Sequence, residues 1–143
     1  MSISSMSDCV SAFVALGDFF RDLSQPDSIS MGSWHEKARQ AMIQARQRNG
    51  WFDEKSILLS FKSWSLALTQ PQIENWLNPF KNSQPPNVKK VGLVLAGNIP
   101  MVGLHDVLCG LVSGHQLIIR CSREDDVLIP LILDFLVDQN PAS

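Results

Sequence analysis

The chain has 143 residues, of which 45% are hydrophobic and 18% charged, so it fits one ordinary domain with a sizeable core, or part of a larger one. A formal net charge of -2 with scattered lysines and arginines excludes an electrostatic footprint for nucleic acid, and three widely spaced cysteines fit reduced thiols. There is no secretory signal pattern, and no apolar run reaches the roughly 20 residues of a membrane helix, so we expect a cytoplasmic chain with no nucleic-acid partner and no membrane span.

Residues 1–81 are predicted to form a helical segment of four helices. The second helix ends at Asn49, Asp53 can cap the third, and Thr69 with Gln72 matches a capping box for the fourth. In each helix the apolar residues recur at three- and four-residue spacing, which indicates one buried stripe per helix. The four stripes are Val10, Phe13, Val14, Gly17 and Phe20; Trp34, Ala38, Ala41, Met42 and Ala45; Ile57, Phe61, Trp64 and Leu68; and Ile73, Trp76, Leu77 and Phe80.

A breaker-rich connection at residues 82–87 leads to a unit with a different pattern, residues 88–143. Residues 91–96 are almost continuously apolar, which predicts a strand covered on both faces. A turn at residues 97–100 follows, and then a helix over residues 105–113 that Gly114 can cap. Residues 117–121 are a second short buried strand. Residues 124–137 are the last helix, and Pro130 places its start later, near Ile129, or kinks it.

The order strand, helix, strand, helix predicts two parallel strands with a right-handed crossover, the opening of a doubly wound sheet. A parallel pair buried on both faces needs neighbouring strands, and the pattern of this chain supplies none. Either a strand is hidden in the helical half or the chain is a fragment, and we favour the fragment. The open strand edges also predict self-association.

Polar residues follow both predicted strands, where open α/β sheets bind their ligands. Gly97 lets a ligand approach the backbone, and the amide of Asn98 can donate to a developing oxyanion. After the second strand, Arg120, Ser122 and Arg123 can bind phosphate or ribose hydroxyls. Plain structural explanations also exist, because Asn is common in turns and charges beside a helix start are commonly solvated. On local chemistry alone we weight these plain explanations more heavily.

Other reactive residues give no second site. The three histidines have no metal-ligand spacing to a cysteine or carboxylate, so we expect no metal. Cys9 and Cys109 are expected to be small core residues. Cys121 lies beside two arginines that favour its thiolate, but no base accompanies it. A P-loop, a GxGxxG fingerprint and a GxSxG elbow are all absent from the sequence.

A family resemblance is strongest over residues 89–136, which read KKVGLVLAGNIPMVGLHDVLCGLVSGHQLIIRCSREDDVLIPLILDFL. An Asn and a Pro two residues apart after a strand, here Asn98 and Pro100, precede a helix, a second strand and a K-x-S motif, here Arg120 and Ser122. With these motifs the chain resembles the acyl-CoA reductase family of the aldehyde dehydrogenase superfamily, whose best-known members supply fatty aldehyde to bacterial luciferase. The helices between residues 50 and 80 are also similar to that family's N-terminal region.

The resemblance implies a catalytic role for Asn98, which falls on the asparagine that stabilises the thiohemiacetal oxyanion. The backbone around Ala96 and Gly97 falls where the nicotinamide end of the cofactor passes. In the implied mechanism a cysteine attacks the acyl-CoA thioester, CoA leaves, and hydride reduces the acyl-enzyme to aldehyde. That cysteine and a glutamate lie downstream of anything in this chain, so we expect the chain alone to be inactive.

The resemblance also implies that Arg120, Ser122 and Arg123 bind the cofactor. Arg120 takes the place of a lysine that contacts the adenosine ribose or its phosphate. This departure keeps the positive charge, but a guanidinium differs from an ammonium group in hydrogen-bond geometry and in length. Arg123 stands where many NAD-preferring relatives carry an acidic residue. A cation there suits a 2′-phosphate, so the expected cofactor is NADPH, with NADH as the alternative.

The predicted fold class is therefore α/β: an N-terminal helical segment, then the incomplete opening of an aldehyde-dehydrogenase-like, Rossmann-type NAD(P)-binding domain. The predicted function is that of the N-terminal part of an NADPH-dependent long-chain acyl-CoA reductase, with acyl-CoA as substrate and a second copy or an acyl-transfer enzyme as candidate partners. Two alternatives stay open. One is another acyl-phosphate or semialdehyde branch of the superfamily, and the other is a stand-alone module that binds nucleotide or protein without catalysis.

Overall fold

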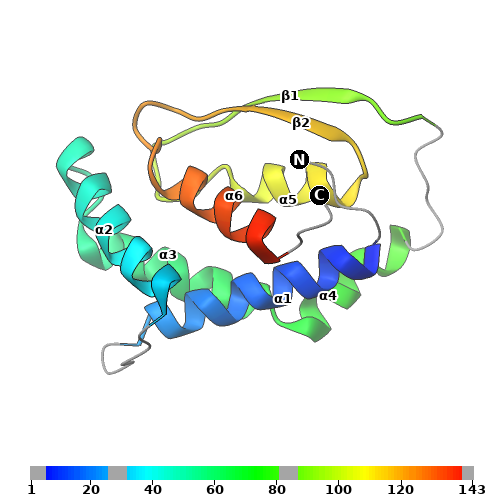
Figure 1. Ribbon diagram of the computed structural model, residues 1–143, viewed down its shortest axis with the longest axis horizontal. Coiled ribbons are helices and arrows are strands. Elements are labelled where there is room, and N and C mark those ends of the chain that lie inside the picture. The colour runs from blue at the N-terminus through cyan, green and yellow to red at the C-terminus, as the bar shows by residue number, and fades with distance from the viewer. Residues whose placement is uncertain (1–5, 26–31, 81–86, 140–143) are drawn as a thin grey trace.

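The computed structural model describes residues 6–25, 32–80 and 87–139. Its elements are α1 (Met6–Leu23), α2 (Ser33–Arg48), α3 (Glu54–Ala67), α4 (Gln70–Leu77), the 3-10 turn η1 (Asn78–Phe80), β1 (Lys90–Val94), α5 (Leu104–Val112), β2 (Gln116–Arg120) and α6 (Leu128–Gln139). The fold is mixed α/β and mostly helical, with a parallel sheet of two strands. Figure 1 shows the helices gathered beneath this sheet. Within the described ranges, no helix combines the length and apolar character needed to cross a membrane.

Local signals account for most helix boundaries in the N-terminal half. The Asp53 carboxylate accepts the Ser56 N–H at 2.7 Å, which confirms Asp53 as the cap of α3. Helix α2 stops at Asn49, whose N–H bonds to the carbonyl of Ala45. The predicted capping box at the fourth helix is wrong, because the Thr69 side chain makes no cap hydrogen bond in the described structure. A proline occupies the first turn of α4.

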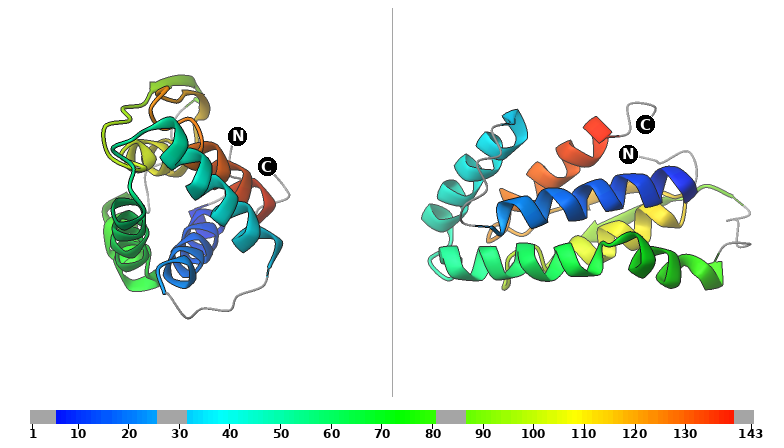
Figure 2. Two further views of the ribbon diagram at one scale, coloured as in Figure 1. Left: turned by 90° about the vertical axis from the view of Figure 1, so that its left-hand side faces the viewer. Right: turned by 90° about the horizontal axis from the view of Figure 1, so that it is seen from below.

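Helix α1 is the centre of the core. It packs against α3, α4, α5 and α6, and Figure 2 shows it lying alongside α3 and α6. Phe13 and Phe20 are completely or almost completely buried, and a fully buried side chain of this kind stabilises the fold by about 2–3 kcal/mol. The rings of Phe19 and Phe135 stack with centroids 4.5 Å apart, which joins α1 to α6. The helical half therefore shares one apolar core with the βαβα unit.

The last stripe of the N-terminal half is only partly buried. Ile73 and Leu77 are buried, but Phe80, predicted to complete that stripe, is 50% exposed. It lies in η1, whose tighter winding takes residue 80 off the face that α4 presents to α1.

The sheet is built as the pattern of the second half predicts. Strands β1 and β2 are parallel, with Lys90 opposite Gln116 and Val94 opposite Arg120, and α5 lies between them in the chain. On the inner face Leu117 is buried against α5. A Cβ at Gly110 would lie 2.6 Å from a terminal methyl of Leu117, so a side chain at this position of the helix would force Leu117 to shift.

The outer face of the sheet is open, which corrects the prediction of a strand covered on both faces. Val94 is 83% exposed and Ile118 is 62% exposed. All helices drawn in Figure 1 lie on the other side of the sheet, so nothing in the described part of the chain covers this face. The apolar run of β1 is present, but residues at alternate positions meet different surroundings.

Helix α6 begins at Leu128, four residues after the start drawn from the sequence and one before the later alternative. Residues 123–127 form turns instead. Pro130 is the third residue of α6, where its missing N–H breaks no helical hydrogen bond.

Candidate functional site

Two loops meet at the carboxyl ends of the strands: the β1–α5 loop, residues 95–103, and the β2–α6 loop, residues 121–127. The Leu95 N–H donates to the Arg120 carbonyl at 3.0 Å, which carries the pairing one residue beyond β1. A Cβ at Gly97 would lie 2.6 Å from both Cβ and Oγ of Ser122 and 3.1 Å from Cβ of Glu124. The absence of a side chain at Gly97 therefore allows the two loops to touch.

The structure places the predicted residues of the first loop at its surface. Asn98 and Ala96 are exposed, and Gly97 between them is buried against the second loop. Among the described residues, none forms a hydrogen bond with the Asn98 side chain. An asparagine that merely satisfied the turn would bond to nearby backbone, so the side-chain amide is available to an external group.

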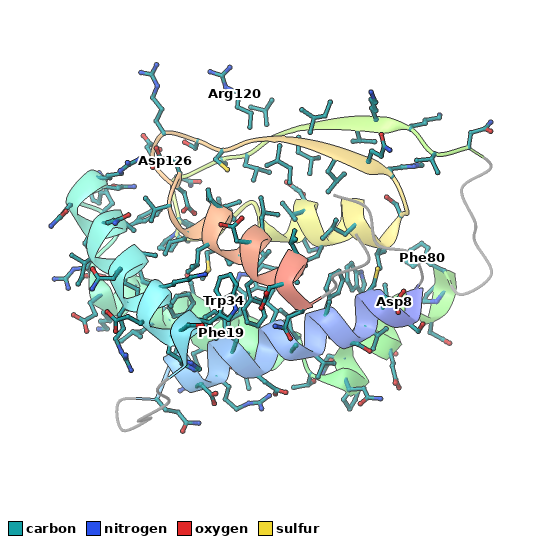
Figure 3. The ribbon with its side chains drawn as sticks, in the orientation of Figure 1. Asp8, Phe19, Trp34, Phe80, Arg120 and Asp126 are labelled. Atoms are coloured by element: carbon teal, nitrogen blue, oxygen red, sulfur yellow. The ribbon has the colours of Figure 1, made fainter. Side chains whose placement is uncertain are left out.

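The predicted cations of the second loop also reach solvent. Arg120 and Arg123 are exposed, Ser122 is half-buried, and within the ranges described above neither arginine forms an ion pair. Figure 3 shows Arg120 extending away from the helices, on the outer side of the sheet. The Ser122 Oγ accepts the Glu124 N–H at 3.3 Å. This edge of the sheet therefore combines positive charge with an open amide, a combination that suits an anionic ligand.

Asp125 is a residue of this region that the sequence did not single out. Its side chain is buried, with 3% of the residue exposed, and its Oδ2 accepts the Met101 N–H at 2.7 Å. Burial raises the pKa of Asp125 to about 6, and the neighbouring Asp126 adds to the rise, whereas the N–H groups of Met101, Leu128 and Ile129 oppose it. Of these only the Met101 N–H forms a hydrogen bond, and Oδ1 has no hydrogen-bond partner among the described residues. A carboxyl group thus joins the β1–α5 loop to the start of α6.

Met101 has a backbone conformation that its side chain disfavours. Its φ is 60°, in the left-handed region, and the residue is completely buried. A non-glycine residue there costs about 1–2 kcal/mol, so surrounding contacts must hold it. The sequence signal nearest to Asp125 is the run of acids before an apolar helix, and Asp125 stands two residues ahead of the position that a helix cap takes. A helix that starts at Glu124 places these acids in its first turn, where solvated carboxylates are common, so the pattern does not indicate a buried aspartate.

The Cys121 thiol behaves differently from the prediction. Its pKa is raised by burial first and then by the charges of Asp125 and Asp126, so the expectation of a favoured thiolate is wrong. Cys9 is buried in the core as expected, and burial raises the pKa of its thiol to about 11.

A separate apolar cleft of about 240 Å³ lies between α3, α4 and α5. Two tryptophans line it, Trp64 and Trp76, together with His105 and Leu108. It contains none of the residues predicted to bind cofactor, and its lining is largely apolar.

No protein-family model, curated protein or solved structure matches this chain. The class of molecule is therefore defined by the fold and the site alone: a mixed α/β chain with two touching loops at the carboxyl ends of a parallel strand pair.

Proposed function

We propose that this chain forms the opening part of the cofactor-binding domain of an NADPH-dependent acyl-CoA reductase, with a Rossmann-type, aldehyde-dehydrogenase-like architecture. One observation carries the proposal. The two loops that hold the resembling motifs are in direct contact, with Gly97 packed on Ser122, at the strand ends where such folds bind nucleotides.

Asn98 supports the catalytic part of the proposal. Its side chain is exposed and has no hydrogen-bond partner among the described residues, so its amide can donate to the oxyanion that forms when a thiolate attacks a thioester. Ala96 beside it is exposed, so the nicotinamide end of a cofactor can reach the loop at that residue, whereas Gly97 is taken up by the contact with Ser122.

Arg120 and Arg123 support the choice of NADPH. Both are exposed, and in the described structure neither forms an ion pair, so their charges are available to phosphate. A guanidinium binds phosphate through two parallel hydrogen bonds, and an additional 2′-phosphate gives the second arginine a partner that NADH lacks. The Ser122 hydroxyl, between them in the chain, can bond to a ribose hydroxyl.

The open outer face of the sheet supports an incomplete site. Val94 and Ile118 are apolar and exposed, and a parallel sheet is normally covered on both faces. Further polypeptide that covers this face would also carry the nucleophilic cysteine and the glutamate of the implied mechanism. We therefore expect the chain by itself to bind NADPH weakly and to reduce no acyl-CoA.

A second candidate is a stand-alone module that binds a protein partner without catalysis. The same exposed apolar residues favour it, because such patches commonly mark protein-binding surfaces. The two candidates differ in their need for nucleotide. A third, another acyl-phosphate or semialdehyde branch of the superfamily, shares the cofactor site and differs only in substrate.

The test is a titration of the chain with NADPH and with NADH, in which nicotinamide fluorescence reports binding. We expect NADPH to bind about tenfold more tightly, a difference of about 1.4 kcal/mol. Arg123→Glu should abolish that preference. Lys62→Glu makes the same charge change on an exposed residue of α3 and should leave it intact.

Two results would contradict parts of the proposal. An unchanged preference in Arg123→Glu removes Arg123 from the cofactor site. Failure of both nucleotides to bind the unaltered chain overturns the cofactor proposal and leaves the protein-binding module.

A further inference from the structure

The carboxylate of Asp125 links two segments that are far apart in the sequence. Asp125 lies three residues before α6 and is buried, near enough to the N–H groups of Leu128 and Ile129 for them to lower its pKa, although its Oδ1 has no hydrogen-bond partner among the described residues. Its Oδ2 also accepts the N–H of Met101, 24 residues earlier, at 2.7 Å. One side chain near the beginning of α6 therefore bonds to the turn that precedes α5.

The turn that Asp125 contacts is held at both ends. At one end Gly97 is pressed against Ser122. At the other end Met101, with its left-handed backbone, donates to Asp125. Asn98 lies between these two contacts, and in the described structure its own side chain is bound to nothing. The position of the Asn98 amide is therefore set by the backbone of the turn and by the two contacts that hold it.

An ordinary helix cap does not explain this arrangement. A cap residue directly precedes its helix, whereas Asp125 stands three residues before Leu128, and a cap would not explain a hydrogen bond to a strained residue of another loop. The neighbouring Asp126 shows the difference, because its carboxylate pairs with Arg48 on α2. Of these two adjacent aspartates, one ties the β2–α6 loop to a helix of the N-terminal half and the other ties it to the Asn98 turn.

We propose that Asp125 is a positioning residue that fixes the Asn98 turn against the β2–α6 loop. In this role it aligns the oxyanion donor with the residues that bind the cofactor. The part about the oxyanion rests on the proposed function, whereas the hold of Asp125 on the turn does not. Asp125 touches no substrate and acts through Met101 and the backbone that leads back to Asn98.

The experiment compares backbone and side-chain amide NMR signals of the unaltered chain with those of Asp125→Ala, Asp125→Asn and Asp126→Asn. In Asp125→Ala we expect the Asn98 side-chain amide and the backbone amides of residues 97–101 to shift or broaden. Asp125→Asn keeps an acceptor for the Met101 N–H and should restore most of the Met101 signal. Asp126→Asn is the matched control and should leave the turn signals in place.

NADPH provides the second measurement. The shift that NADPH induces at residue 98 should fall at least twofold in Asp125→Ala and recover in Asp125→Asn. Nucleotide that fails to bind the unaltered chain overturns the proposed function, while the nucleotide-free spectra still test the role of Asp125.

Unchanged Asn98 and Met101 signals in a folded Asp125→Ala chain would overturn the inference. If that variant does not fold, the pH titration of the unaltered chain decides. The chemical shift of the Met101 amide proton should change with pH with a midpoint near 6, the pKa of its acceptor Asp125. This change should be absent in Asp125→Asn. Asp126 and the Cys121 thiol are the titratable neighbours of Asp125, and Asp126→Asn removes the first of them. A Met101 amide that is insensitive to pH contradicts the inference.

Discussion

The two faces of the β1–β2 sheet carry similar side chains in opposite surroundings. On the inner face Leu117 is 9% exposed and packs against Gly110 of α5, whereas Ile118, its neighbour in the chain, is 62% exposed on the outer face. Within the described residues, the helices therefore stabilise one side of the sheet only. A continuously apolar parallel strand indicates that both faces of the sheet are covered. The described residues of this chain cover only the inner face.

The largest expected effect separates the two faces directly. Leu117→Ala should lower the free energy of unfolding by about 2–4 kcal/mol, because it opens a cavity against α5. Ile118→Ala should change it by about 0.5 kcal/mol or less, because its side chain already meets water. Urea unfolding of both variants measures the difference. Equal losses would mean that the outer face is covered in solution.

The next effect concerns the carboxyl that is buried on the inner side of the loops. Since the pKa of Asp125 is raised to about 6, the folded state binds more protons than the unfolded state between about pH 4 and 6. Its contribution to stability is therefore fully present below about pH 4 and is lost as the pH rises through 6, a change of roughly 2–3 kcal/mol.

Unfolding of the unaltered chain and of Asp125→Asn across this pH range checks that effect. The stability of the unaltered chain relative to the variant should fall with rising pH and level off above pH 7. A relative stability that rises over the same range has the wrong sign and would show that Asp125 is better satisfied when charged.

Two glycines provide a matched pair for the contact between the loops. Gly97→Ala should cost about 1–3 kcal/mol, because its Cβ would collide with Ser122 and the loops must move apart. A Cβ at Gly92 on the outer face would meet nothing within 4 Å, so Gly92→Ala should be nearly neutral. Thermal unfolding and the Asn98 amide signal measure both variants. A Gly97→Ala chain as stable as Gly92→Ala would contradict the close approach of the loops.

The smallest effect on stability belongs to charge on the outer face. Ile118→Lys should change the free energy of unfolding by no more than about 0.5 kcal/mol but should reduce self-association through the open strands. Sedimentation velocity over a range of concentrations compares the variant with the unaltered chain. An unaltered chain that stays monomeric at high concentration would show that the exposed face and edges do not associate.

The order of the elements was predictable from the sequence because the signals for it are local. Asp53 caps α3 as its spacing indicated, and the two apolar runs became β1 and β2 in parallel register. Parallel strands end at the same edge of a sheet, so the sequence predicted that the two loops lie at that edge. It did not predict their direct contact.

The exposure and burial of individual side chains depend on tertiary contacts, which no local sequence pattern encodes. The exposure of Val94 follows from where the helices lie, whereas the continuous apolar run of its strand indicated two covered faces. Asp125 belongs to an acidic run that looks solvated, and its burial follows from the turn around Met101 packing over it. The raised pKa of Cys121 likewise depends first on burial of the thiol and then on the charges of Asp125 and Asp126, neither of which the adjacent arginines reveal.

The most direct test of the account maps nucleotide binding residue by residue. Backbone amide signals of the unaltered chain are followed during titration with NADPH and then with NADH. We expect shifts at residues 96–98 and 120–123 together, larger with NADPH at positions 120–123. Absence of any shift, or shifts confined to the apolar cleft around Trp64 and Trp76, would contradict the claim that the two loops form one nucleotide site.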